Sequence, residues 1–371
     1  MLKDSNFINR NHKFKQVVVQ YMGFRNSKYF ELIKQNIKLF NLDLSNYNIL
    51  LPSSPKEPAL LAVIAAMSGA KNVYVKTIKQ QIKEHIAKTT KELGFENIKC
   101  VDITTQEVLF GSNIVVKGGE IDKIEGAFIN QLNKKRVITL FPENLDFNNT
   151  DNIDLEACNK ERTSVVGIDP DDKNLNLYKY FSHIILKRCY EAGIDVYKSR
   201  VLLVGHGSLL DSSLQLLKAA GAIVYSCNIK ASLDHAFVLK RFPELDAIIV
   251  IDYPQTSMQI IGSKGVISIS DIVDLCPNAK VIHVCGKLEE NSLNFGKIKY
   301  FPATINSNSI NLNIRELGER GLIEIATACL KVADNSIKSN ESSMNINDSV
   351  VTYKILNKIN PVLLGWDQRG R

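Results

Sequence analysis

The feature that most constrains the fold is a glycine turn that joins a buried strand to a helix. Residues 200–204 (Arg-Val-Leu-Leu-Val) predict the strand, the turn reads Gly205-His206-Gly207-Ser208, and residues 209–220 predict the helix. Gly205 permits the sharp turn, and Gly207 lets a diphosphate approach the backbone. The start of the helix adds free N–H groups and a partial positive charge. This strand-turn-helix context therefore predicts a dinucleotide site, and we expect Gly207→Val to abolish binding while the fold stays intact.

Two departures from the usual pattern leave the cofactor open. Leu210 stands where a third small residue is usual, and the second strand ends in Ser-Cys-Asn-Ile-Lys (226–230) without the acid that binds a ribose 2′-hydroxyl. Either Asn228 and Lys230 accept a 2′-phosphate, which favours NADP over NAD, or no dinucleotide binds. The residues predicted to contact NADP or NAD are Gly205, His206, Gly207, Ser208, Leu209, Asn228, Lys230, Asp252, Tyr253 and Gly286.

Short apolar strands, among them residues 16–21 and 265–268, alternate with amphipathic helices along the chain, which predicts an α/β protein with parallel sheets. We expect two Rossmann-like doubly wound domains with a cleft between them, linked by long helices. Residues 142–172 are rich in Asn, Asp and Pro and predict a loop-rich connector. The predicted parts are an α/β substrate domain (1–172), a linker helix (173–198), a Rossmann dinucleotide-binding domain (199–310), a return helix (311–335) and a partly mobile C-terminal tail (336–371).

Composition excludes several classes of protein. The 371 residues are 45% hydrophobic and 23% charged, which is typical of globular proteins, and no apolar run is long enough to span a bilayer. The net charge of +7 is spread over the chain, so neither a nucleic-acid nor a membrane partner is expected. Seven scattered cysteines without a Cys-x-x-Cys pair predict no metal site and a cytoplasmic location. The apolar stretch after residue 349 is expected to dock on its own chain or on a partner subunit, and the second case favours a homodimer.

Residues 165–335 resemble S-adenosylhomocysteine hydrolase and the formate and D-2-hydroxyacid dehydrogenases. A predicted helix over 175–192 precedes the glycine turn, as the linker helix does in that superfamily. Residues 247–252 resemble the strand that ends beside the cofactor, 281–287 resemble the next strand, and 317–332 resemble the helix that crosses back to the first domain. The resemblance implies a cofactor domain, a substrate domain and a dimer. The Arg-Gly pair of the dehydrogenases appears here as Gly286-Lys287. The resemblance therefore does not imply that this chain catalyses the reaction of either family.

Candidate catalytic residues follow the predicted strand 280–284. Lys287 could stabilise negative charge on a substrate, His283 could act as acid or base, and Glu289 could orient a proton donor. The alternatives are a surface lysine, a hydrogen-bonded core histidine and a solvated loop carboxylate. In the first domain two turns predict binding of an anionic substrate group, with an ordinary helix cap as the alternative for the first. Their residues are Ser53, Ser54, Lys56, Lys117 and Gly118.

Together these features predict an NAD(P)-dependent oxidoreductase, a dehydrogenase or reductase, that acts on a small polar metabolite at the interdomain cleft. Two alternatives stay open. One is a lyase or hydrolase that holds NAD tightly and uses it transiently. The other is a non-catalytic Rossmann-like binding protein, which the missing acid and Leu210 favour.

Overall fold

The computed structural model describes residues 28–54, 57–132, 136–142, 149–172, 174–230, 244–303, 310–341 and 353–355. These residues form two compact units. The first unit takes the residues up to Phe141, Thr150–Ile168 and those from Ile323 on, and the second takes Pro142, Asn149 and Asp169–Leu322. Among the described residues no helix is both long and apolar enough to cross a membrane.

The first unit is built on a seven-stranded sheet in the order β14-β6-β5-β4-β1-β2-β3. Six strands are parallel and β14 pairs antiparallel with β6. The parallel strands follow the full Rossmann order, whose switch point lies between β1 and β4. The strands are β1 (Asn48–Pro52), β2 (Asn72–Lys76), β3 (Ile98–Val101), β4 (Ile114–Lys117), β5 (Val137–Leu140), β6 (Ser164–Ile168) and β14 (Tyr353–Ile355).

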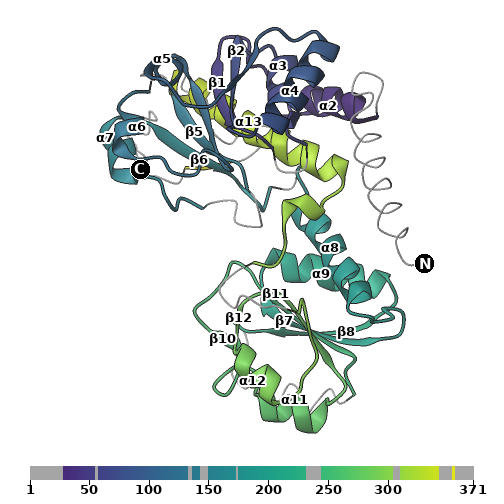
Figure 1. Cartoon of the computed structure of the whole chain (residues 1–371). Helices are drawn as coiled ribbons and strands as arrows, with labels where there is room; N and C mark the ends of the chain where they lie inside the picture. The colour runs from purple at the N-terminus through teal and green to yellow at the C-terminus, as the bar shows by residue number, and fades with distance from the viewer. Residues whose placement is uncertain are drawn as a thin grey trace, which may run out of the picture. The chain divides into compact units, whose positions relative to one another are not determined.

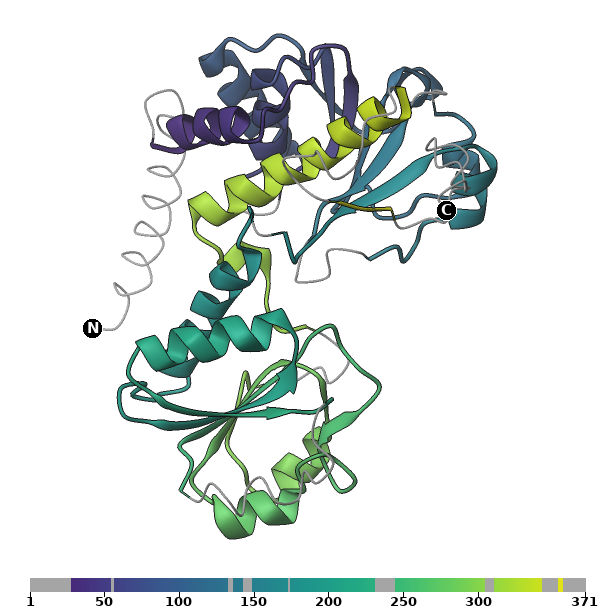
Figure 2. The same ribbon diagram turned by 180° about the vertical axis from the view of Figure 1, so that it is seen from behind.

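Helices cover both faces of this sheet because successive strand residues point to opposite faces. On one face Leu50, Val115 and Ile138 form a buried cluster with side chains of α5, α6 and α7. On the other face α13 crosses the sheet (Figure 2), and the Thr139 hydroxyl donates to the Cys329 carbonyl at 3.0 Å. The helices are α2 (Lys28–Leu39), α3 (Leu60–Met67), α4 (Gln80–Leu93), α5 (Gln106–Gly111), α6 (Gly126–Ile129), α7 (Leu155–Lys160) and α13 (Glu319–Glu341).

The second unit has a five-stranded parallel sheet in the order β13-β11-β9-β7-β8, with α8 and α9 on one face and α11 and α12 on the other (Figure 1). Beside it β10 pairs with β12. The chain reverses its direction of winding between β7 and β9, the switch point at which open α/β sheets bind ligands. Its elements are α8 (Leu177–Glu191), β7 (Arg200–His206), α9 (Ser208–Ala219), β8 (Ile223–Asn228), β9 (Ala247–Asp252), β10 (Gln259–Ile261), α11 (Ile269–Leu275), β11 (Lys280–Cys285), β12 (Lys287–Leu288), α12 (Glu290–Phe295) and β13 (Tyr300–Phe301).

These two doubly wound sheets confirm the predicted α/β fold class, but three local predictions need correction. The segment 142–172 contains α7 and the fully buried strand β6 in addition to loops. Residues 265–268 form no strand: Val266 and Ile267 donate to the carbonyls of β10 at the end of a turn. Helix α13 runs on to Glu341, past its predicted end at residue 332. The predicted strand 16–21 lies outside the described residues.

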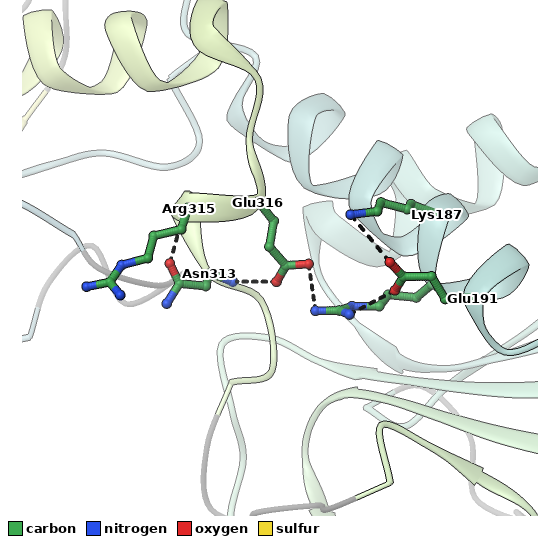
Figure 3. A network of polar contacts seen from close by, with 6 residues as sticks. Lys187, Glu191, Asn313, Arg315 and Glu316 are labelled. Atoms are coloured by element: carbon green, nitrogen blue, oxygen red, sulfur yellow. Dashed lines mark hydrogen bonds and ion pairs between the residues drawn. The ribbon is translucent and has the colours of Figure 1, made fainter. Parts of the chain in front are cut away.

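A polar network holds the segment before α13 against α8 within the second unit (Figure 3). Arg188 Nη2 lies 2.6 Å from Glu316 Oε2, and Arg188 Nη1 lies 2.9 Å from Glu191 Oε2. Glu316 also completes a capping box with Asn313, which fixes the short 3₁₀ helix Ile314–Glu316. The Arg188 guanidinium carbon Cζ lies over the Phe301 ring, 5.6 Å from the ring centroid. One arginine therefore joins α8, β13 and the 3₁₀ helix that precedes α13.

Candidate active site at the β7–α9 turn

Both glycines of the turn make room for the neighbouring strand β9. A Cβ on Gly205 would lie 1.8 Å from the Ile251 carbonyl oxygen, and a Cβ on Gly207 would lie 2.4 Å from the Tyr253 carbonyl oxygen. Gly207 also has φ +84°, which disfavours other residues. The sequence predicts that the missing Cβ of Gly207 lets a diphosphate approach, whereas in the structure it makes room for the backbone that follows β9. Gly207→Val is therefore expected to disturb the fold as well as any site, which corrects the expectation that the fold stays intact.

The first turn of α9 leaves backbone donors free. Gly207 is the N-cap residue and offers no side-chain acceptor. Within the described part of the chain, no hydrogen bond uses the N–H groups of Ser208, Leu209 or Leu210. Three free donors and the positive end of the helix dipole therefore meet at the carboxyl edge of the sheet, beside the switch point. This arrangement can bind an anion such as a diphosphate.

A carboxylate of the chain itself lies against the start of α9. Asp171 Oδ1 accepts a 2.8 Å hydrogen bond from the Ser208 hydroxyl. Asp171 also accepts from the Tyr178 hydroxyl, whose pKa is raised by burial and then by the nearby Tyr253 and Asp171. Asp171 belongs to the predicted loop-rich connector 142–172, and no local sequence pattern indicates this contact. An aspartate near the N-terminus of a helix stabilises the helix. The Asp171 carboxylate therefore occupies the position at the start of α9 where a bound anion would be expected.

Removing the Asp171 charge is therefore expected to strengthen anion binding at the turn. We predict that Asp171→Asn tightens NADPH binding about three- to tenfold, because a like charge about 4 Å away costs about 1 kcal/mol when water screens the pair. Fluorescence titration of NADPH measures the change. Asp274→Asn on α11 removes an equal, exposed charge elsewhere in the unit and is the matched control. Equal affinities for the two variants would contradict the prediction.

The end of β8 presents the two residues predicted to contact a 2′-phosphate. Asn228 and Lys230 are both exposed, and the Asn228 side-chain oxygen accepts from the Lys230 N–H at 3.0 Å. This bond fixes the backbone of the turn and leaves the lysine ammonium free of any ion pair with the described residues. A cation therefore lies at the position where an acid would select NAD.

His206 and Asp252 face each other across β7 and β9. Their Nδ1 and Oδ1 atoms are 2.9 Å apart, and the side chains are 6% and 0% exposed. Asp252 Oδ2 accepts from the Thr256 N–H and hydroxyl at 2.9 and 2.8 Å. Burial, and then the Lys230 charge, lower the pKa of His206 although Asp252 raises it. The structure thus places a buried imidazole–carboxylate pair at the switch point.

His283 is held at both ring nitrogens. Nε2 lies 2.7 Å from the Gly286 carbonyl oxygen and Nδ1 lies 2.6 Å from the Asn311 side-chain nitrogen. This geometry fits a neutral ring that donates from Nε2 and accepts at Nδ1. Burial lowers its pKa, which also favours the neutral form. The arrangement favours the alternative of a hydrogen-bonded core residue over an acid or base.

Lys287 and Glu289, two of the predicted catalytic residues, have different surroundings in the structure. Lys287 opens β12 opposite Gln259 of β10 and is half-buried. Glu289 Oε2 accepts from the Ser263 N–H at 2.8 Å, and this bond holds the pKa of Glu289 below its usual range. Glu289 therefore supports the 262–265 turn as an anion, and its assigned role of orienting a proton donor stays a prediction. The catalytic role assigned to Lys287 likewise stays a prediction.

In the first unit the predicted anion-binding residues meet at the switch point between β1 and β4, but acids already occupy their donors. The Ser53 hydroxyl donates to Glu120 at 3.0 Å, and Lys117 Nζ lies 3.3 Å from Asp122 Oδ1. Glu120 also accepts from Thr77. Glu120 was not among the predicted site residues, although it directly follows the Gly118-Gly119 pair. These contacts do not favour an anionic ligand at this edge.

The other predicted substrate residues have structural surroundings. Ser54 is buried and its hydroxyl accepts from the Leu61 N–H in the first turn of α3 at 3.4 Å, while the N-cap residue of this helix is Ala59. A Cβ on Gly118 would lie 3.3 Å from the Phe141 carbonyl oxygen, so this glycine permits the contact between the ends of β4 and β5. Lys56 lies outside the described residues.

No known protein family matches the sequence, and no curated protein matches it significantly. Solved structures do match its fold. One chain of dipicolinate synthase from Bacillus subtilis aligns with a TM-score of 0.55 at 11% identity over 81% of this chain and 99% of that one. The corresponding dipicolinate synthase chain from Bacillus halodurans gives 0.52 at 11% identity over 80% and 98%. NAD-dependent formate dehydrogenase from Staphylococcus aureus, solved with NAD, gives 0.50 at 10% identity over 82% and 98%.

The chain has the fold of the two-domain Rossmann-type dehydrogenases. This confirms, for the fold, the resemblance to formate and D-2-hydroxyacid dehydrogenases that residues 165–335 suggested. At 10–11% identity the likeness concerns the arrangement of helices and strands alone. The chemistry must therefore be argued from the residues of this chain.

Proposed function

We propose that the second unit binds NADP or NAD with the diphosphate at the start of α9, and that the protein is an NAD(P)-dependent oxidoreductase acting on a small polar metabolite. The observation that carries the proposal is the set of three free N–H groups, Ser208 to Leu210, at the β7–β9 switch point. The fold it shares with a formate dehydrogenase solved with NAD supports it. The nicotinamide would supply the hydride chemistry.

The residues of this chain would bind and orient the cofactor. The N–H groups of Ser208 and Leu209 would donate to the diphosphate, while Gly205 and Gly207 keep the turn close to β9. Asp171 would move away from Ser208 as the diphosphate enters. At the end of β8, Lys230 and Asn228 would contact a 2′-phosphate on the adenosine ribose, and for this reason we favour NADP.

A non-catalytic binding protein is the second candidate, and two contacts favour it. Asp171 already fills the anion position at α9, and both nitrogens of His283 are used inside the fold. A lyase or hydrolase that holds NAD tightly remains a further alternative. The homodimer, the cytoplasmic location and the lack of nucleic-acid and membrane partners stay predictions.

The cofactor proposal makes a specific prediction for Lys230. We expect Lys230→Ala to weaken NADP binding roughly 10- to 30-fold and NAD binding less than twofold, because a hydrogen bond to a charged group contributes about 1.5–3 kcal/mol. Calorimetric titration with each nucleotide measures both affinities. Lys218→Ala, at the far end of α9, removes the same charge from an exposed position. Equal losses for NADP and NAD would refute the role of Lys230.

A further inference from the structure

The His206–Asp252 pair belongs to the edge of the sheet at which the cofactor is proposed to bind. His206 is the residue between the two glycines of the turn, two positions before Ser208. In β7 the preceding even-numbered residues Leu202 and Val204 lie in the hydrophobic cluster of the unit, and Ile248 and Val250 of β9 lie in the same cluster. By strand alternation His206 and Asp252 continue that face at the carboxyl ends of their strands.

His206 is a buried polar group whose hydrogen bonds are incomplete. It is 4% exposed, and neither ring nitrogen has an aligned hydrogen-bond partner among the described residues. Buried polar groups without partners are rare and point to a function or a bound species. Asp252 is fully buried and held at Oδ2 by Thr256, so its Oδ1 atom is fixed toward the ring. The carboxylate is a ready counter-ion for an imidazolium.

We propose that His206 takes up one proton from solvent when a dinucleotide diphosphate binds at the start of α9, with Asp252 as the counter-ion of the imidazolium. This inference rests on the proposed cofactor site. The positive charge of Lys230 at the end of β8 opposes protonation of His206, whereas the Asp252 carboxylate of β9 favours protonation. The Cys285 thiol of β11 contacts Asp252 and stays neutral because burial raises its pKa. A bound phosphate neutralises Lys230 and adds negative charge beside the ring, so the balance shifts to the imidazolium.

The sign of the pH dependence follows from this proton uptake. In the free protein the pKa of His206 is lowered, so the ring is neutral near pH 7. The bound state has the higher pKa. Between the two pKa values the affinity falls as pH rises, by at most tenfold per pH unit for one coupled proton. Below the lower pKa and above the higher one, His206 contributes no pH dependence.

Isothermal titration calorimetry of the full chain with NADP tests the proposal. Titrations at pH 7.5 in PIPES, HEPES and Tris give the number of protons taken up from the dependence of the heat on the buffer. We expect a measurable uptake, of at most one proton, for wild type and for His183→Gln, which changes an exposed histidine on α8. We expect the uptake to vanish in His206→Gln. Protons exchanged by the nucleotide itself contribute equally to every titration, so they cancel when the proton uptake of one variant is subtracted from that of another.

The outcomes separate this inference from the proposed function. NADP binding without proton uptake, or an uptake unchanged by His206→Gln, overturns the proton-coupled pair and leaves the cofactor site standing. No binding of NADP or NAD overturns both. Should His206→Gln fold poorly, Asp252→Asn serves instead, and NMR titration of the six histidines in wild type with and without NADP gives the same answer. No histidine signal with a raised pKa in the complex then overturns the inference.

Discussion

Gly205→Ala is expected to destabilise the second unit by about 3–5 kcal/mol. The added Cβ would lie 1.8 Å from the Ile251 carbonyl oxygen and 2.9 Å from the Asp252 nitrogen, both backbone atoms of a central strand. Neither atom can rotate away, so β7 and β9 must separate at their carboxyl ends. The glycine also has φ +151°, which adds conformational strain for alanine.

Urea unfolding followed by circular dichroism measures this loss. Gly318→Ala is the matched control, since its Cβ meets no atom within 4 Å and its backbone is not in the glycine region. We expect the control to change the free energy of unfolding by less than about 0.5 kcal/mol. A loss for Gly205→Ala no larger than that of the control would show that β9 does not lie against the turn as described.

Asp334→Ala is expected to destabilise the first unit by about 3–5 kcal/mol, because it leaves a buried ammonium without its counter-ion. Asp334 is fully buried on α13 and lies 2.8 Å from Lys331 Nζ and 2.7 Å from Lys338 Nζ. Lys331 is itself buried and donates to the Asn41 carbonyl oxygen at 2.8 Å. The pair thus ties α13 to the end of α2.

Free energies of unfolding of further variants distinguish the effect of an uncompensated charge from the effect of lost packing. The double variant Lys331→Met with Asp334→Leu removes both charges and fills their volume, and we expect it to be within about 1 kcal/mol of wild type. Lys338→Ala, which removes the more exposed partner, should cost less than about 1 kcal/mol. If the double variant were as unstable as Asp334→Ala, packing and not charge would explain the loss.

The local pattern around β7 was sufficient to predict the strand, the turn and α9. A buried apolar run, a glycine pair and an apolar-periodic helix are all encoded within about twenty residues, and the structure has β7 at Arg200–His206 and α9 at Ser208–Ala219. Strand β6 was missed because its short apolar run stands between polar segments and is buried only by neighbours in the sheet. Strand identity there depends on tertiary contacts.

The candidate site was predictable only in part because its contacts span long stretches of sequence. Asp171 lies 37 residues from Ser208, and Glu120 lies 67 residues from Ser53, so no local pattern links either pair. The role of the glycines was also misassigned, since a turn that admits a ligand and a turn that admits a neighbouring strand need the same missing Cβ. Only the position of β9 distinguishes the two.

A crystal structure of the full chain grown with saturating NADPH would show whether the β7–α9 turn holds a dinucleotide. We expect electron density for a diphosphate within hydrogen-bond distance of the Ser208 and Leu209 N–H groups, with the Asp171 carboxylate displaced from Ser208 and the 2′-phosphate near Lys230. Density for the nucleotide at another place, or an unoccupied turn in which Asp171 still accepts from Ser208, would contradict it.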